Sequence, residues 1–359
     1  MGNGHDVIDS TGAGDQDTPL GPPPVRASGG FGSLGDQTFV VGVSLVPASV
    51  LVGRRIVCRT LLGVVVAMLL PACRPLESHD PTVLTVQRAR QLVAQHKDTL
   101  TLNDPTTLSD EAAEALATHK GSLVLNGLMD VAPATAARLA KHQGPLRLGG
   151  LKTLSKNVAQ ALEPHEDLLI LDGVTTLTPE VAEALARHGG PLRLDGLTEL
   201  SPELAIALSR HGSLLGLNGL TMLTPEVAMA LARSQADLGL RGLPTLPVDV
   251  AEALSSHDGY LLLDGVSSLS PEAARALAGH ERPMSLDGLA ELAPDLAAAL
   301  ATHEGASTLN GVTELSDAAA RALAKRQGPL ALDRLEKISP EAAERLRANP
   351  RIRLPQSLR

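Results

Sequence analysis

Residues 169–191 read LILDGVTTLTPEVAEALARHGGP, and this stretch contains the signals that decide the fold. Its opening Leu-Ile-Leu alternates inward and outward positions, which predicts a short strand with one buried face. An Asp-Gly turn follows, and then Thr178, Pro179 and Glu180 predict the start of a helix. They supply an N-cap hydroxyl, a proline at the first helical position and an acid near the positive end of the helix dipole. The two glycines after the histidine predict a left-handed helix end.

The same pattern returns every 23 residues along the chain. A leucine occupies one position of each unit without exception: Leu116, Leu139, Leu162, Leu185, Leu208, Leu231, Leu254, Leu277, Leu300, Leu323 and Leu346. A fixed period of this length is typical of a solenoid, in which each unit buries its apolar face against the next. We therefore predict an α/β solenoid of eleven repeats over residues 100–350, with one parallel sheet. Each unit should have a strand of about three residues and a helix of about ten.

The consensus L-x-L-[DN]-G-L-T-x-L-[ST]-P-E-x-A-x-A-L-A-x-H resembles a bacterial leucine-rich repeat. The resemblance implies a curved solenoid with helices on the convex side, and it implies no particular ligand. Residues 74–99 are expected to form a linker and an N-terminal capping half-repeat, and residues 351–359 a C-terminal cap with a polar outer face. Residues 1–53 are expected to be a disordered or spurious N-terminal extension.

A different kind of sequence precedes the repeats. Residues 54–73 contain arginines, then a ten-residue apolar run, then Cys73. This order resembles a bacterial lipoprotein signal peptide, in which Leu70, Ala72 and Cys73 match the lipobox and Pro71 departs from it. The resemblance implies lipidation of Cys73 and a membrane-tethered, extracytoplasmic protein of the cell envelope. An uncleaved membrane anchor and a cytoplasmic protein are the alternatives.

Composition argues against several classes of function. The chain has a formal charge of -9 at pH 7, no Trp and one Tyr, whereas nucleic-acid binding needs basic surfaces and stacking aromatic rings. Catalysis needs a nucleophile, a base and an orienting group that converge once, and here Ser, His and Asp recur as copies of repeat positions. We therefore expect a monomer with no enzymatic activity, no cofactor and no nucleic-acid partner.

Nine of the eleven histidines share one repeat position: His96, His119, His142, His165, His188, His211, His257, His280 and His303. A metal-binding or pH-responsive column is one interpretation. The other is structural, because an imidazole at a helix end can bond free main-chain carbonyls. We favour the structural interpretation and predict no metal site, since side chains on neighbouring helices should lie about 9–10 Å apart, too far to share an ion.

A second column contains Asn or Asp before the glycine: Asn103, Asn126, Asp172, Asp195, Asn218, Asp264, Asp287, Asn310 and Asp333. Such a run could bind calcium, as repeats of parallel β-helices do. We favour a structural role, in which each side chain accepts a hydrogen bond from a backbone N–H of its own turn. Asn serves that role as well as Asp, whereas calcium prefers carboxylates.

Function is expected where the units differ. The outward strand position reads Thr101, Val124, Arg147, Ile170, Arg193, Gly216, Gly239, Leu262, Ser285, Thr308 and Ala331, and it predicts a concave surface for a protein partner. The candidate contacts on it and beside it are Arg147, Ile170, Arg193, Leu262, Arg241 and Tyr260. The predicted function is a non-enzymatic protein-binding scaffold for an unknown protein or envelope component. A metal-binding or pH-responsive solenoid and a purely structural envelope spacer are the alternatives.

Overall fold

The computed structural model describes residues 83–358, which belong to one compact unit, Arg74–Arg359. The predictions for Cys73, for the signal-like segment and for the N-terminal extension lie outside the described residues. Within residues 83–358, no helix is long and apolar enough to cross a membrane.

Short strands and short helices alternate along this unit. The strands are β1 Val83–Leu84, β2 Thr99–Thr101, β3 Thr107–Leu108, β4 Ser122–Val124, β5 Leu146–Arg147, β6 Leu169–Ile170, β7 Leu192–Arg193, β8 Leu215–Gly216, β9 Leu238–Gly239, β10 Leu261–Leu262, β11 Met284–Ser285, β12 Ser307–Thr308, β13 Leu330–Ala331 and β14 Ile352–Arg353. The helices are α1 Val86–Gln95, α2 Asp110–Ala117, α3 Pro133–Leu139, α4 Lys156–Leu162, α5 Pro179–Leu185, α6 Pro202–Leu208, α7 Pro225–Leu231, α8 Val248–Ser255, α9 Pro271–Leu277, α10 Pro294–Leu300, α11 Asp317–Leu323 and α12 Pro340–Arg347, followed by a 3-10 turn at Gln356–Leu358.

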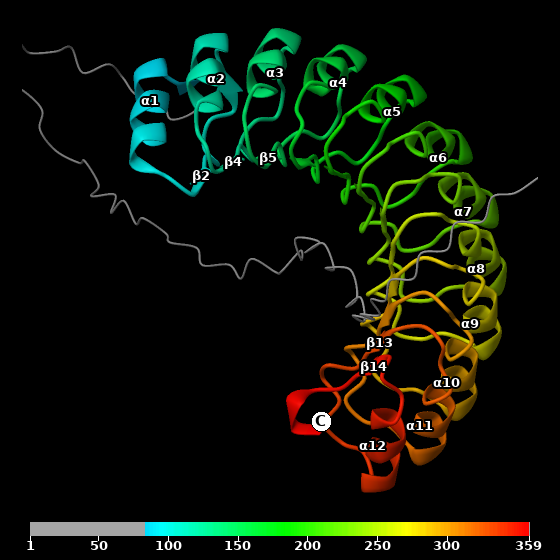
Figure 1. Ribbon diagram of the computed structural model, residues 1–359. Helices are drawn as coiled ribbons and strands as arrows, with labels where there is room; N and C mark the ends of the chain where they lie inside the picture. The colour runs from blue at the N-terminus through cyan, green and yellow to red at the C-terminus, as the bar shows by residue number, and fades with distance from the viewer. Residues whose placement is uncertain (1–82, 359) are drawn as a thin grey trace, which may run out of the picture. The chain divides into compact units, whose positions relative to one another are not determined.

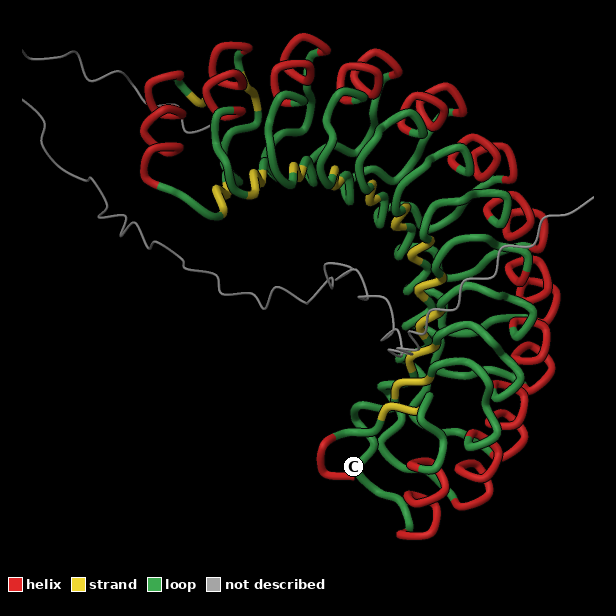
Figure 2. The backbone as a smooth tube through the Cα atoms, in the orientation of Figure 1, coloured by secondary structure: helices red, strands yellow, loops and turns green. Residues whose placement is uncertain are grey.

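Twelve strands form one parallel sheet in sequence order from β2 to β14, while β1 pairs with β3 apart from it. The register follows the repeat, so that Leu169 pairs with Leu192 and Ile170 pairs with Arg193. The strands line the inner edge of an arc and the helices line its outer edge (Figures 1 and 2). The predicted fold class, a leucine-rich-repeat-like α/β solenoid with helices on the convex side, is confirmed by this arrangement.

The helices begin where the sequence predicts but end earlier. The Thr178 hydroxyl caps α5 by accepting a hydrogen bond from the Val181 N–H, and Pro179 is the first helical residue. The helix then ends at Leu185 after seven residues instead of about ten. The prediction was too long because the chain curls inward after Leu185, where the backbone N–H of His188 bonds to the Leu185 carbonyl. Most strands likewise contain two residues instead of three.

Leucine and alanine form the core. In the fifth unit, Leu171, Ala182 and Leu185 are at most 1% exposed, and the same positions are buried in the neighbouring units. Alanine at the fixed helical position lets each helix lie close to the sheet. A larger residue there would overpack the unit at a cost of about 1–3 kcal/mol.

Glycine is required where successive units approach closely. A β-carbon on Gly173 would lie 2.1 Å from the Gly149 carbonyl oxygen, and one on Gly190 would lie 2.3 Å from the Glu166 carbonyl oxygen. Neither has a left-handed backbone, since Gly144 alone among the described glycines has a positive φ. The predicted left-handed helix end is therefore wrong, and Gly190 is needed for backbone contact between units.

Candidate functional site

The histidine column lies inside the solenoid. From His119 to His303 its imidazoles are at most 3% exposed and stack in parallel, with ring centroids 5.8–6.3 Å apart. Five rings form an unbroken stack from His119 to His211, and three more form a second stack from His257 to His303. The predicted spacing of about 9–10 Å between units is too large for these rings, because units on an arc draw together toward its inner edge.

Hydrogen bonds show what this position does. The Nε2 atoms of His119 and His188 lie 3.3 and 3.2 Å from the carbonyl oxygens of Asp98 and Asp167, each in the preceding unit. Ser234 takes the place of a histidine in the column, and its hydroxyl donates to the His211 carbonyl, again in the preceding unit. The interpretation that the column bonds main-chain carbonyls is thus supported for these members, whose carbonyls belong to the preceding unit. At His96, the first member of the column, Nδ1 lies 2.9 Å from the Leu92 carbonyl of its own helix, as predicted.

Arg326 occupies the same column and is 2% exposed. Its guanidinium donates to the carbonyls of Leu300, Gly305 and Gly328 and to the Ser307 hydroxyl. Burial lowers the pKa of Arg326 to about 10, so the side chain remains charged at neutral pH. Its charge is therefore stabilised by main-chain dipoles of the preceding unit.

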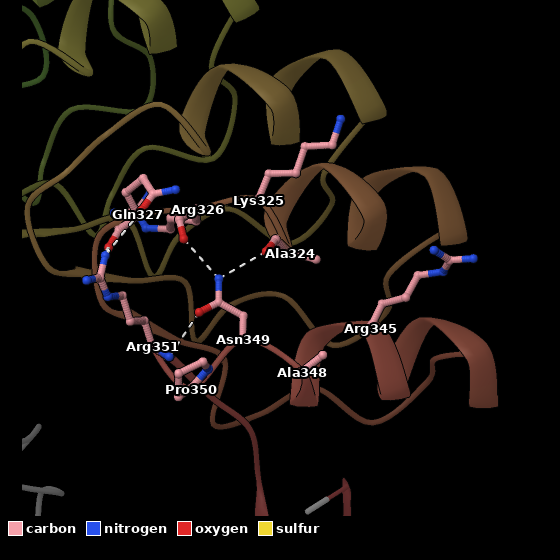
Figure 3. Close-up of a pocket in the computed structure, with 9 residues that line it drawn as sticks. All are labelled: Ala324, Lys325, Arg326, Gln327, Arg345, Ala348, Asn349, Pro350 and Arg351. Carbon is pink, nitrogen blue, oxygen red and sulfur yellow. Dashed lines mark hydrogen bonds between the residues drawn. The ribbon is translucent and has the colours of Figure 1, made fainter.

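The column ends at Asn349, inside an open polar pocket at the C-terminal end of the solenoid (Figure 3). The Asn349 amide donates to the carbonyls of Ala324 and Arg326 at 3.0 and 2.9 Å. Arg351 lies beside it and donates to the Gln327 carbonyl. These contacts join the last unit to the preceding one, so the residues of the pocket have a structural role at this interface.

Burial also determines the charge of the imidazoles. Desolvation lowers the pKa of His142, His165, His211 and His257, and lowers that of His188, His280 and His303 to about 4. These seven rings are therefore neutral at pH 7. Among residues 83–358, no group of three or more His, Cys, Asp or Glu side chains is arranged to hold a metal ion.

The Asx column forms a second ladder, on the concave side of the core. The Asp195 carboxylate accepts hydrogen bonds at 2.9 Å from both the backbone and the side-chain amide of Asn218. Asn218 in turn accepts from the Arg241 backbone N–H at 3.0 Å. The predicted bonds within each turn are thus replaced here by bonds to the next unit. Stacking brings the same residue of successive units within hydrogen-bonding distance, which a single turn cannot reveal.

The candidate contacts fall into two groups on the concave face. Arg147, Ile170 and Arg193 pair side by side at the ends of β5, β6 and β7. Arg193 forms ion pairs with Asp172 at 2.9 Å and Asp195 at 2.8 Å. The outward column itself contains no acid, but its arginines reach the carboxylates of the neighbouring Asx column. Reading the sequence two residues beyond Arg193 would have identified Asp195, whereas Asp172 lies 21 positions before Arg193 and 25 after Arg147.

The second group lies around β10. Arg241 pairs with Asp264 at 2.8 Å, and Leu262 ends β10. Tyr260 immediately precedes that strand, and its burial, with the nearby carboxylates of Asp264 and Asp287, raises the pKa of its hydroxyl.

The prediction that Ile170 and Leu262 face solvent is wrong. Their exposed fractions are only 9% and 7%. On the inner edge of an arc adjacent units crowd together, so longer neighbouring side chains can cover a side chain that points outward. Ile170 has such neighbours in Arg147 and Arg193, which pair with it on either side.

Comparison with known proteins gives only distant similarity. No protein-family model matches the chain, and no curated protein matches it. A leucine-rich-repeat protein of Leptospira interrogans is similar over 76% of this chain and 99% of its own, with 17% identity and a TM-score of 0.35. An internalin of Listeria monocytogenes is similar over 76% of this chain and 89% of its own, with 10% identity and a TM-score of 0.32. At such low scores the fold assignment rests on this chain's own strand order and register.

Proposed function

We propose that this chain is a non-enzymatic protein-binding scaffold that takes its partner on the concave face of the sheet. One observation carries the proposal: at the outward strand position, paired neighbours differ from one unit to the next. Arg147, Ile170 and Arg193 stand side by side, whereas Gly216 and Gly239 leave the next two strands without side chains. Inward positions repeat the same residues for packing, so recognition is left to the outward ones.

The position of the helices supports the same face. They line the outer edge of the arc, while the strand edge remains uncovered by helices within the repeat unit (Figure 2). A concave sheet of twelve strands offers an extended surface of the kind that repeat proteins use for binding. The His and Asx columns do not enter the proposed function, because they are engaged in contacts between units.

The proposed partner is a protein or another component of the cell envelope, bound by a monomer. Nucleic acid is excluded from the proposal because the chain carries a formal charge of -9. The signal-like residues before Cys73 support export and attachment to a membrane through a lipid. Mass spectrometry of the mature N-terminus tests this part: we expect a diacylglycerol on Cys73, and an unmodified or uncleaved N-terminus would contradict it.

Photo-crosslinking from the two faces tests the binding surface. A photoreactive amino acid is placed in the full chain at Val124 or Thr308 on the concave face, and at Glu183 or Ala298 on the outer helices as matched controls. We expect adducts to one partner from the concave positions and none from the helices. Adducts only from the helices would contradict the proposed face. A purely structural spacer would give no specific adduct from either.

A further inference from the structure

Arg147 and Arg193 occupy the same repeat position, two units apart, but they have different electrostatic surroundings. Arg193 lies between two carboxylates, Asp172 at 2.9 Å and Asp195 at 2.8 Å. These residues stand 21 positions before it and two positions after it. At Arg147 the equivalent positions hold Asn126 and Gly149. Where Arg193 has two carboxylates beside it, Arg147 therefore has an amide and a glycine.

The remaining contact of Arg147 is weak. Its one ion pair among the described residues is with Asp172 at 3.5 Å, and that carboxylate is already engaged by Arg193 at the shorter distance. The Arg147 side chain is 42% exposed, compared with 22% for Arg193. Arg147 thus presents on the concave face a positive charge that its own neighbours neutralise only in part.

Unused hydrogen-bonding atoms converge at the same place. The buried Nε of Arg147 has no acceptor, and the buried Oδ1 of Asn126 has no donor. Both face the space that a side chain at Gly149 would fill, since a β-carbon there would lie 2.6 Å from the Asn126 oxygen and 3.7 Å from the Arg147 Nε. The Arg147 guanidinium thus retains hydrogen-bonding capacity that its own neighbours do not use.

Apolar side chains flank this arginine in the sheet. Val124 pairs with Arg147 on one side and Ile170 pairs with it on the other. Val124 is partly exposed and Ile170 is covered. An arginine set between aliphatic side chains is typical of the residues that dominate binding energy at protein interfaces.

We propose that Arg147 is the anchor that binds a carboxylate side chain of the protein partner, and that Arg193 is a structural cross-link between units. The planar guanidinium presents two parallel N–H groups, which match the two oxygens of a carboxylate. The partner is therefore an acidic segment of a protein. This inference rests on the proposed function and specifies the chemistry of its site.

Selection of random displayed peptides on the full chain tests the anchor. We expect the enriched peptides to share an Asp or Glu, and the affinity of a synthetic enriched peptide to fall about 10- to 100-fold in Arg147→Ala. Arg147→Lys keeps the charge but loses the fork, so its affinity should lie between the two. Arg275→Ala on the outer helix α9 is the matched control and should leave affinity unchanged. Circular dichroism verifies that each variant is folded.

A charge swap tests for direct contact. Arg147→Glu should abolish binding of the acidic peptide and bind a peptide whose acid is replaced by Lys, whereas a structural effect would not be rescued. Enrichment of no acidic sequence, or unchanged affinity in Arg147→Ala, overturns the anchor. In either case, crosslinking of the enriched peptides to a photoreactive residue at Thr308 on the concave face would leave the proposed function standing. Crosslinking only to the outer helices would overturn the proposed function as well.

Discussion

The two ends of the buried column have different side chains at the same repeat position. From His119 to His211 five imidazoles stack without a break. Toward the C-terminus Arg326 and then Asn349 take the position. Arg326, Asn349 and at least two of the imidazoles contact main-chain carbonyls of the preceding unit. The members that form such a side-chain hydrogen bond have a donor in common and not an imidazole. Neither ring nitrogen has a partner in six other imidazoles: His142, His165, His211, His257, His280 and His303.

The imidazoles at one end of the column and Arg326 and Asn349 at the other differ in how they respond to pH. A neutral imidazole can be buried with one hydrogen bond at modest cost, whereas protonating it would place a charge in the core. Arg326 already carries a charge there and offsets it with four hydrogen bonds. Asn349 never titrates and lies at the last interface, where it is only partly buried. Acid should therefore act on the histidine units first.

Acidification is expected to have the largest effect. The folded pKa of His188, His280 and His303 is about 4, below the ordinary value of 6.5, so the unfolded chain binds more protons between these values. Stability should be complete above pH 6.5 and decrease as pH falls toward 4. At pH 5 each of these residues should remove about 2 kcal/mol relative to pH 7.5. Urea unfolding at both pH values measures the loss, and equal stabilities would contradict it.

Removing the buried arginine should have the next largest effect. Arg326→Met leaves the Gly305 carbonyl without a donor and removes one of the two donors to the Leu300 carbonyl, although it also removes a buried charge. We expect a loss of about 3 kcal/mol or more in the free energy of unfolding at pH 7.5. Arg326→His should lose less, because His119 and His188 show that an imidazole can reach the carbonyl 21 residues earlier. Equal losses in both variants would contradict a role of this side chain as a hydrogen-bond donor.

Replacing one imidazole within the stack distinguishes its contribution as a hydrogen-bond donor from its contribution to the pH dependence of stability. His188→Leu leaves the Asp167 carbonyl unpaired and should cost about 1–3 kcal/mol at pH 7.5. His188→Asn keeps a donor, as Asn349 does at the last interface, and should cost about 1 kcal/mol. Both variants should lose less stability between pH 7.5 and 5 than the unmodified chain. An unchanged pH dependence would mean that the pKa of His188 is not lowered by burial.

Filling the gap in the stack should have the smallest effect at neutral pH. Ser234 separates the two imidazole stacks, and its hydroxyl bonds to the His211 carbonyl. Ser234→His exchanges one donor for another but loses the acceptor of the Ala236 N–H, so it should change the free energy of unfolding at pH 7.5 by about 1 kcal/mol. It should nevertheless increase the loss at pH 5, since one more buried ring then titrates. Matched urea titrations of the variant and the unmodified chain measure both quantities.

Much of the fold could be predicted because its signals are local and repeated. Thr178 and Pro179 mark a helix start within a few residues, and a fixed leucine reports the same buried face in every unit. The helix end was harder to predict. After Leu185, the last residue of α5, the His188 N–H bonds to the Leu185 carbonyl and the His188 ring contacts the Asp167 carbonyl of the preceding unit. A contact with another unit is not encoded in the helix itself.

The candidate site was only partly predictable. The sequence identified Arg147 and Arg193 as outward residues of one column. It treated them as equivalent because a single column does not show which side chains from other columns reach them. The stacking of units brings Asp172 to Arg193 but Asn126 to Arg147, while Asp195 and Gly149 lie two residues beyond each arginine in the same unit.

The period, the inward leucines and alanines and the helix starts can be read from the sequence, as can the acidic, aromatic-poor composition. These properties follow from the chemistry of residues close together in the chain. The tertiary structure adds that imidazoles stack about 6 Å apart, that the Asx ladder crosses between units and that Arg147 differs from Arg193. Each of these depends on the distance between residues about 23 positions apart, which is set by how an arc of packed units narrows toward its concave side.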